Sequence, residues 1–333
     1  MVVPCYNKAK HISAMLDSVI NQEWNNIELI LVNDGSTDGT REIISDYESK
    51  LERRGYDVII IDQENAGCCA AVHAGLLRMR GDYYCLVDCD DMIEPKYVSR
   101  MAGWLDAYKD CEWAACTFRV VVHSEQNNNE RPPGTKKFRP DAGKLLERHI
   151  FRTTFAATWI YMARVSYLKK CGMIDNFCTE RRATYEPLII APLALGAGKL
   201  EFFNEPLYIF NQDAMGLSRF DSIKQCVRYY KDYLYLYRWA IEKSSISDDR
   251  KQRLHEISRI GFYKDLYRHV PNLPKNEDYM PNIVQGLTHA LNEIFKPAKL
   301  VDVEKLEAKG LRRVFDEIEN AVIEGDGTYA CKF

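Results

Sequence analysis

The amino-acid sequence predicts an α/β fold, in which a mostly parallel sheet is flanked by helices and followed by an all-helical region. Three observations support this prediction. Apolar runs of strand length alternate with segments of helical periodicity up to about residue 122. The apolar runs are nearly continuous, which indicates strands that are buried on both faces, as in parallel sheets. Beyond residue 221 the pattern is helical throughout.

Each element of this alternation follows from its residue pattern. The helices have apolar residues at the i, i+3, i+4 and i+7 spacing of a half-buried helix, and they are predicted at 12–20, 43–51, 72–79 and 98–108. Gly55 and Gly81 are expected to end the second and third helices, and Pro95 opens the fourth. A short first strand ends in PCYN (4–7), and the other strands are predicted at 27–33, 56–62, 83–88 and 113–122.

The later part of the chain contains polar connections and long helices. Residues 123–140 are polar and contain Pro and Gly, which predicts a long exposed loop or a hairpin. Helices are predicted at 226–244, 248–268, 283–296 and 302–324, with a linker at 271–282. Tyrosines crowd the helix at 226–244. Core packing is the first interpretation, a homodimer interface the second and a membrane surface the third.

The composition is that of a globular protein. With 46% hydrophobic and 28% charged residues, the 333-residue chain can bury a sizeable core. We find no apolar run long enough for a transmembrane helix and no signal peptide. The 11 cysteines show no CxxC or zinc spacing, which favours reduced thiols. The net charge of −3 does not favour nucleic acid. We therefore expect a cytoplasmic protein, with peripheral attachment at the inner face of the membrane as a further option.

Three aspartates follow the strand predicted at 83–88. Ligands of such sheets bind beyond the carboxyl ends of the strands, so these carboxylates are expected at a binding edge. On an extended chain, Asp88 and Asp90 point to one face and Cys89 to the other. Two carboxylates on one face suit Mg²⁺ or Mn²⁺, which would neutralise a diphosphate leaving group. The alternative is a turn in which Asp91 starts the loop or caps the next helix.

A second polar motif follows the strand predicted at 27–33. Asp34 comes directly after this strand, and Gly35 permits a sharp turn. The next residues, Ser-Thr-Asp at 36–38, are of the type that caps helices. A carboxylate at this place could accept a hydrogen bond from a nucleotide base, although the same residues taken alone fit an ordinary turn.

Four motifs in this order resemble glycosyltransferase family 2, a group of enzymes with the GT-A fold. The matching stretches are Pro4-Cys5-Tyr6-Asn7, Asn33 to Asp38, Asn65-Ala66-Gly67 and Asp88-Cys89-Asp90-Asp91. The resemblance is strong over 1–100, weaker over 150–220 and absent beyond. It implies a GT-A catalytic domain at 1–220, with a nucleotide-sugar half at about 1–100 and an acceptor half at about 101–220. A C-terminal helical domain at 221–333 would follow.

The resemblance also implies roles for the motif residues. The donor-binding residues would be Pro4, Tyr6, Asn7, Asp34, Gly67, Asp88, Cys89 and Asp90. Asp34 would contact the base, usually uracil, and Asp88 the ribose or sugar. Asp90, in an Asp-x-Asp motif, would hold Mn²⁺ or Mg²⁺ on the diphosphate, with Asp91 as the second metal residue.

The third motif departs from the family pattern. An Ala-Arg-Asn sequence is usual there, whereas this chain has Ala71, Val72 and His73. The change removes a cation expected near the donor, and His73 either replaces part of its role or packs. The identity of the base and sugar is therefore left open.

An inverting transferase needs a general base that deprotonates the acceptor hydroxyl. The family supplies it from a Glu-Asp pair that opens a helix, and the matching pair here is Glu186-Pro187. Glu186 is therefore the predicted base, although a glutamate beside a first-turn proline is also a common structural charge. Glu180 and Asp175 are the alternatives. If none of them serves, the enzyme is weak or inactive.

Family members often carry a Ser and a basic residue near the diphosphate in a later loop. Ser218 and Arg219 in NQDAMGLSR (211–219) occupy that place. They are predicted to bind the donor on a loop that orders with it. The alternative is a surface loop that binds no ligand.

These observations together predict an inverting, metal-dependent glycosyltransferase. It would move a hexosyl or N-acetylhexosaminyl group from a nucleotide sugar, a UDP-sugar by resemblance, to a glycan, lipid-linked or protein acceptor, as in polysaccharide biosynthesis. One alternative is a nucleotidyltransferase, which the absence of glycine in PCYNKAKH disfavours. The other is a weak or inactive nucleotide-sugar-binding partner subunit, which turnover would distinguish.

Overall fold

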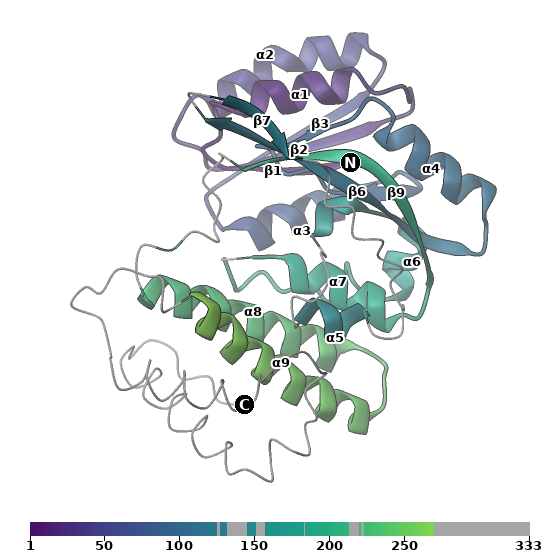
Figure 1. The fold of residues 1–333 in the computed structure, drawn as a ribbon. Coiled ribbons are helices and arrows are strands. Elements are labelled where there is room, and N and C mark those ends of the chain that lie inside the picture. Colours follow the sequence, from purple (N-terminus) through teal and green to yellow (C-terminus); the bar gives the residue numbers. More distant parts are fainter. Residues whose placement is uncertain are drawn as a thin grey trace.

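The computed structural model describes residues 1–124, 127–131, 145–150, 157–182, 184–212, 220 and 223–269 (Figure 1). The described residues form a three-stranded sheet, in the order β1-β2-β3, and a six-stranded sheet that follows it. The predicted α/β class is therefore confirmed. The linker predicted at 271–282 and the helices predicted at 283–296 and 302–324 lie outside the described residues.

The first sheet is parallel and consists of β1 (Val2–Cys5), β2 (Glu28–Asp34) and β3 (Asp57–Gln63). Helices α1 (Ile12–Ile20) and α2 (Thr40–Arg53) lie over one face, and α3 (Cys68–Arg78) lies over the other (Figure 1). Residues Leu29 to Val32 of β2 are fully buried, because helices cover both sides of the strand. This part agrees with the predicted parallel sheet.

The second sheet is mixed. Its strands, in spatial order, are β4 (Tyr83–Cys85), β8 (Tyr161–Arg164), β6 (Cys111–Ser124), β9 (Lys199–Asn211) and β5 (Met92–Ile93). β6 and β9 are parallel, whereas the pairs β4–β8, β6–β8 and β5–β9 are antiparallel. The hairpin alternative for the polar stretch after residue 122 is realised in part, because β7 (Asn127–Arg131) pairs with the end of β6.

The predicted strand at 83–88 has regular pairing only as far as Cys85. Its continuation turns toward β1, where Leu86 forms a parallel bridge with Val2 and the Val87 amide donates to the Val2 carbonyl at 3.1 Å. This contact joins the two sheets. It also brings the three aspartates after Val87 beside the carboxyl end of β1.

Helices α4 (Tyr97–Ala107), α6 (Val165–Lys170) and α7 (Glu186–Leu195) pack around the second sheet. A separate apolar cluster lies among α5 (Leu145–Ile150), α7, α8 (Ile223–Lys243) and α9 (Asp248–His269). Tyr230, Tyr233 and Tyr237 of α8 are buried in that cluster, so core packing is what the structure shows for them. Within the described part of the chain, no helix combines the length and the apolarity needed to cross a membrane.

Candidate active site at the strand ends

The loops after β1 and β2 are bonded to each other. The side-chain oxygen of Asn7 accepts a hydrogen bond from the Thr37 amide at 2.8 Å, and the Asn7 amide donates to the Ser36 hydroxyl at 3.1 Å. Asn7 has a φ of 51°, in the left-handed region that asparagine tolerates better than most residues. The predicted nucleotide-pocket residue Asn7 therefore joins the first two motifs.

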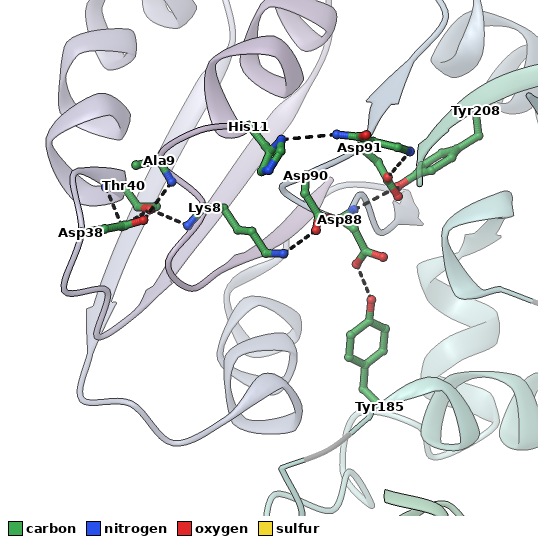
Figure 2. Close-up of polar contacts among 11 residues, drawn as sticks. Lys8, Ala9, His11, Asp38, Thr40, Asp88, Asp90, Asp91, Tyr185 and Tyr208 are labelled. Carbon is green, nitrogen blue, oxygen red and sulfur yellow. Dashed lines mark hydrogen bonds and ion pairs between the residues drawn. The ribbon is translucent and has the colours of Figure 1, made fainter. Parts of the chain in front are cut away.

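The rest of the loop between β1 and α1 is fixed in the same way (Figure 2). The Lys8 amide donates to the Thr40 hydroxyl at 2.8 Å, and the Ala9 amide donates to the Asp38 carboxylate at 3.1 Å. Asp38 also accepts from the Thr40 amide at 3.0 Å. These bonds hold the backbone from which the Lys8 side chain extends.

Asp34 connects the second motif to the third. Its carboxylate is 3% exposed and accepts from the side chain of Gln63 at 2.7 Å and from the amides of Ala66 and Gly67, each at 2.8 Å. Gly35 has a φ of 66°, and a Cβ atom there would lie 2.6 Å from the Asn65 amide nitrogen, so a glycine is required. Asp34 thus shapes the pocket loop, and its contact with a base stays a prediction.

The three aspartates of the fourth motif have different surroundings (Figure 2). The Asp88 carboxylate accepts a hydrogen bond from the Tyr185 hydroxyl at 2.5 Å, and the Asp88 amide donates to the Tyr208 hydroxyl at 3.1 Å. Burial raises the pKa of the Asp88 carboxyl to about 7, and the charges of Asp90 and Glu186 add to this rise. The bond from Tyr185 acts in the opposite direction.

Asp90 faces Lys8. The Lys8 ammonium lies 2.6 Å from the Asp90 carboxylate, and the two side chains are 20% and 17% exposed. Burial opposes the charge of Lys8, but the attraction of Asp90 and the bond to it outweigh burial and raise the pKa of Lys8. Asp90 is therefore a mostly shielded carboxylate that is paired with the Lys8 ammonium.

Asp91 points the other way, into the protein. It is 2% exposed, and its two oxygens accept from the Tyr208 hydroxyl at 2.9 Å and from the Asn211 amide at 2.8 Å. Burial, together with the charges of Asp88 and Asp90, raises the pKa of Asp91 well above its usual value. Coordination of a metal by Asp91 would require these bonds to be given up.

Asp90 is the residue of this motif whose surroundings would allow a divalent metal to be held. Among the described residues, no group of three or more His, Cys, Asp or Glu side chains is arranged to hold a metal by itself. Mg²⁺ in phosphate-transferring sites is typically bound by one or two carboxylates together with the phosphates of the substrate. Asp90, which is partly exposed, is the carboxylate of this motif that could hold such a metal together with a diphosphate.

The other predicted donor residues are placed as follows. Pro4 lies in β1, and Tyr6 is 46% exposed at the start of the loop after it. Cys89 is 5% exposed and belongs to the core cluster, so a donor would meet its backbone rather than its thiol. Ser218 and Arg219 lie outside the described residues.

The structure brings the predicted base to the acidic motif. Glu186 is the first residue of α7, it follows the Tyr185 that binds Asp88, and its charge acts on Asp88. Of the alternatives, Glu180 accepts a hydrogen bond from Tyr235 of α8 at 3.0 Å, and Asp175 lies exposed in the turn after α6.

Val72 and His73, which differ from the usual family residues in the third motif, both pack inside the protein. Val72 is fully buried in the core. The ring of His73 stacks on Phe177 with centroids 5.5 Å apart, and its Nε2 atom lies 3.1 Å from the Ile174 carbonyl oxygen. Of the two interpretations of His73, packing is the one that the structure shows.

Sequence reasoning missed four side chains of this site: Lys8, Arg182, Tyr185 and Tyr208. Arg182 donates to the Asn65 carbonyl at 2.9 Å, and the thiol of Cys68 donates to the Arg182 carbonyl at 3.1 Å. Tyr185 precedes the predicted base, and Tyr208 ends a Glu-Pro-Leu-Tyr stretch that matches the family pattern. The position of these tyrosines next to a motif was the signal that the sequence offered. That position alone does not tell which residues they contact.

Comparisons with known proteins agree with these motifs. Residues 1–170 match the family Glycosyl transferase family 2. Glycosyltransferase GlyG of Streptococcus pneumoniae is 34% identical over 286 residues, which are 80% of this chain and 92% of GlyG. Glycosyltransferase GlyA of the same species is 44% identical over 101 residues, which are 30% of this chain and 14% of GlyA. The chain therefore spans a small part of GlyA and most of GlyG.

Two solved structures share the fold. S. aureus TarS in complex with UDP-GlcNAc has a TM-score of 0.59 and 16% identity, over 98% of this chain and 91% of that chain. Mannosyltransferase PcManGT from Pyrobaculum calidifontis, in complex with GDP-Man and Mn²⁺, has a TM-score of 0.55 and 15% identity, over 98% and 87%. The predicted GT-A architecture is confirmed. With its N-terminal half matched to the family and with GlyG aligned over most of both chains, this chain belongs to glycosyl transferase family 2.

Proposed function

We propose that this protein transfers a sugar from a nucleotide sugar to an acceptor hydroxyl, with a divalent metal on Asp90 and with Glu186 as the general base. One observation carries the proposal. The hydrogen bond from Tyr185 to Asp88 brings the start of α7, and thus Glu186, to the motif that contains Asp90. The proposed metal carboxylate and the proposed base would then belong to one site.

The nucleotide would lie on the carboxyl ends of β1 to β3. Pro4, Tyr6 and Asn7 would line its pocket beside Gly67, and Asp34 would contact the base from the loop that it organises. The structures of TarS with UDP-GlcNAc and of PcManGT with GDP-Man support a nucleotide-sugar donor. We propose a UDP-sugar, bound also by Asp88 and by the Cys89 backbone, with Ser218 and Arg219 reaching the diphosphate.

The reaction is a single displacement. The acceptor oxygen bonds to the anomeric carbon as the bond between that carbon and the diphosphate oxygen breaks, which inverts the configuration. The acceptor proton passes to the Glu186 carboxylate, a contribution of roughly 10²- to 10⁴-fold for a positioned base. A bound Mn²⁺ or Mg²⁺ would neutralise the charge on the departing diphosphate. The acceptor would be a glycan, a lipid-linked sugar or a protein.

A panel of nucleotide sugars, assayed for nucleotide release with Mn²⁺ and with EDTA, tests this proposal. We expect metal-dependent release from one donor, which identifies the sugar. Glu186→Gln should lower turnover by roughly 10²-fold or more while UDP still binds. Glu180→Gln is the matched control and should keep wild-type turnover.

Two outcomes would contradict parts of the proposal. If Glu180→Gln loses turnover and Glu186→Gln keeps it, the base is misassigned. If no donor is turned over with a range of acceptors although UDP binds, the protein is the inactive binding subunit that Pro187 suggests.

A further inference from the structure

The Lys8–Asp90 ion pair places a lysine on the carboxylate that we assign to the metal (Figure 2). The contact is 2.6 Å long, and about four fifths of each side chain is shielded, with 20% and 17% exposed. The Lys8 amide is held by Thr40, so the ammonium reaches Asp90 from a fixed backbone. The pair is therefore a defined contact between the first and fourth motifs.

The three aspartates of the acidic motif differ in the charge of their partners. Asp88 and Asp91 accept hydrogen bonds from the neutral hydroxyls of Tyr185 and Tyr208. Asp90 receives a full positive charge instead. Within the described part of the chain, Lys8 supplies the ion pair that the structure shows for this acidic motif.

We propose that Lys8 is a built-in counter-cation, which occupies Asp90 until a divalent metal and a nucleotide diphosphate arrive together. This inference rests on the proposed function, because it assumes that Asp90 is the metal ligand. A divalent cation on Asp90 would lie within a few ångströms of the Lys8 ammonium, and two cations at that separation repel each other. Metal alone therefore has to compete with Lys8.

A diphosphate removes this competition. Lysine binds phosphate oxygens as a point charge, so the ammonium can move from Asp90 to the diphosphate of the donor. Asp90 would then be free to hold the metal beside the same diphosphate. Metal and nucleotide would thus bind with positive coupling, and Lys8 would be the residue that produces it.

The test measures Mn²⁺ affinity by calorimetry or by electron paramagnetic resonance, with and without UDP. Lys8→Met keeps most of the length of the side chain and removes the charge. Without UDP, this variant should bind Mn²⁺ at least tenfold more tightly than the wild type. Addition of UDP should increase the Mn²⁺ affinity of Lys8→Met by a factor at least tenfold smaller than the factor in the wild type. Lys8→Arg, which keeps the charge, and Lys10→Met, at an exposed position, should both resemble the wild type.

A second readout covers the stability of the variant. In EDTA, Lys8→Met should unfold at a lower temperature than the wild type. Addition of Mn²⁺ without UDP should raise the unfolding temperature of the variant by more than it raises that of the wild type. The inference would be overturned if Lys8→Met and the wild type bind Mn²⁺ equally well without UDP. If both also bind Mn²⁺ when UDP is present, the proposed metal site itself would stand. Failure of the wild type to bind Mn²⁺ even with UDP would overturn the metal site, and the role of Lys8 with it.

Discussion

Two regions of the molecule build the candidate site, and they are connected over different lengths of chain. The loops after β1, β2 and β3 bond to one another across 29 to 33 residues, as in the contacts of Asn7 with Ser36 and of Asp34 with Gly67. The acidic motif instead binds Tyr185 and Tyr208 across 97 to 120 residues. We refer to these as the strand-end loops and the crossing tyrosines.

The difference has a structural cause. About 30 residues is the length of one strand-helix-strand unit, so successive parallel strands bring their ends together at this spacing. The strand-end loops are thus placed by local chain topology. The crossing tyrosines depend on how the second sheet, with its mixed directions, packs on the first. Variants of each region should therefore fail in different ways.

The largest effect is expected from Asp90→Asn, within the acidic motif itself. An amide is a poor ligand for a hard divalent cation, and the loss of several kcal/mol of charge stabilisation lowers donor turnover by roughly 10³-fold. Nucleotide release at saturating donor measures this. Asp46→Asn, at an exposed position of α2, is the control and should keep wild-type turnover. Turnover of Asp90→Asn that remains within a few-fold of wild type would place the metal elsewhere.

A large effect on stability is expected from Tyr208→Phe. The Tyr208 side chain is fully buried, and its hydroxyl accepts from the Asp88 amide and donates to Asp91. Leaving these buried groups without that partner costs about 1–3 kcal/mol of the free energy of unfolding. Urea denaturation measures it, with Tyr108→Phe, at a position that is 46% exposed, as the control. Equal stabilities of the two variants would mean that the Tyr208 hydroxyl is not a structural link.

Sequence periodicity predicted most of the first sheet and its helices. The helix expected at 12–20 is α1, and the spacing of Ile12, Met15, Leu16 and Val19 matches the residues that it buries. The strand expected at 83–88 is shorter, because the chain leaves β8 after Cys85 and meets β1 at Leu86. That change depends on the contact between the two sheets, which residue spacing does not encode.

The candidate site could also be predicted only in part from the sequence. Cys89 was predicted to point away from Asp88 and Asp90 on an extended chain, and its side chain is buried in the core. The backbone at 88–91 is not extended, however, because a turn forms there, with the Asp91 amide bonded to the Asp88 carbonyl at 3.1 Å, as in the alternative interpretation. The opposite orientations of Asp90 and Asp91 could not be predicted. They depend on Tyr208 and Asn211, which β9 brings to the motif from more than 115 residues away.

A smaller, functional effect is expected from Tyr185→Phe. Its hydroxyl donates to the Asp88 carboxyl, whose raised pKa of about 7 leaves it partly neutral at pH 7. The bond is therefore worth about 1 kcal/mol, and kcat/KM for the donor should fall by roughly fivefold. Tyr235→Phe removes the analogous bond to Glu180 and is the matched control, which should leave kcat/KM unchanged. If the control variant is the more impaired, Glu180 rather than Glu186 belongs to the reaction.

The smallest effect is expected from Arg182→Met, which tests whether a residue close in sequence to the crossing tyrosines also supports the strand-end loops. Arg182 donates to the Asn65 carbonyl at 2.9 Å and contacts the turn at Gly67, but it is exposed, so water competes for its guanidinium. Loss of such a contact is worth below about 1 kcal/mol and predicts a roughly threefold weaker affinity for UDP, measured by calorimetry. Arg80→Met is the control, because Arg80 pairs with Glu28 and Asp57 at the other end of the sheet. UDP affinities that match in the two variants would mean that Arg182 does not support the strand-end loops.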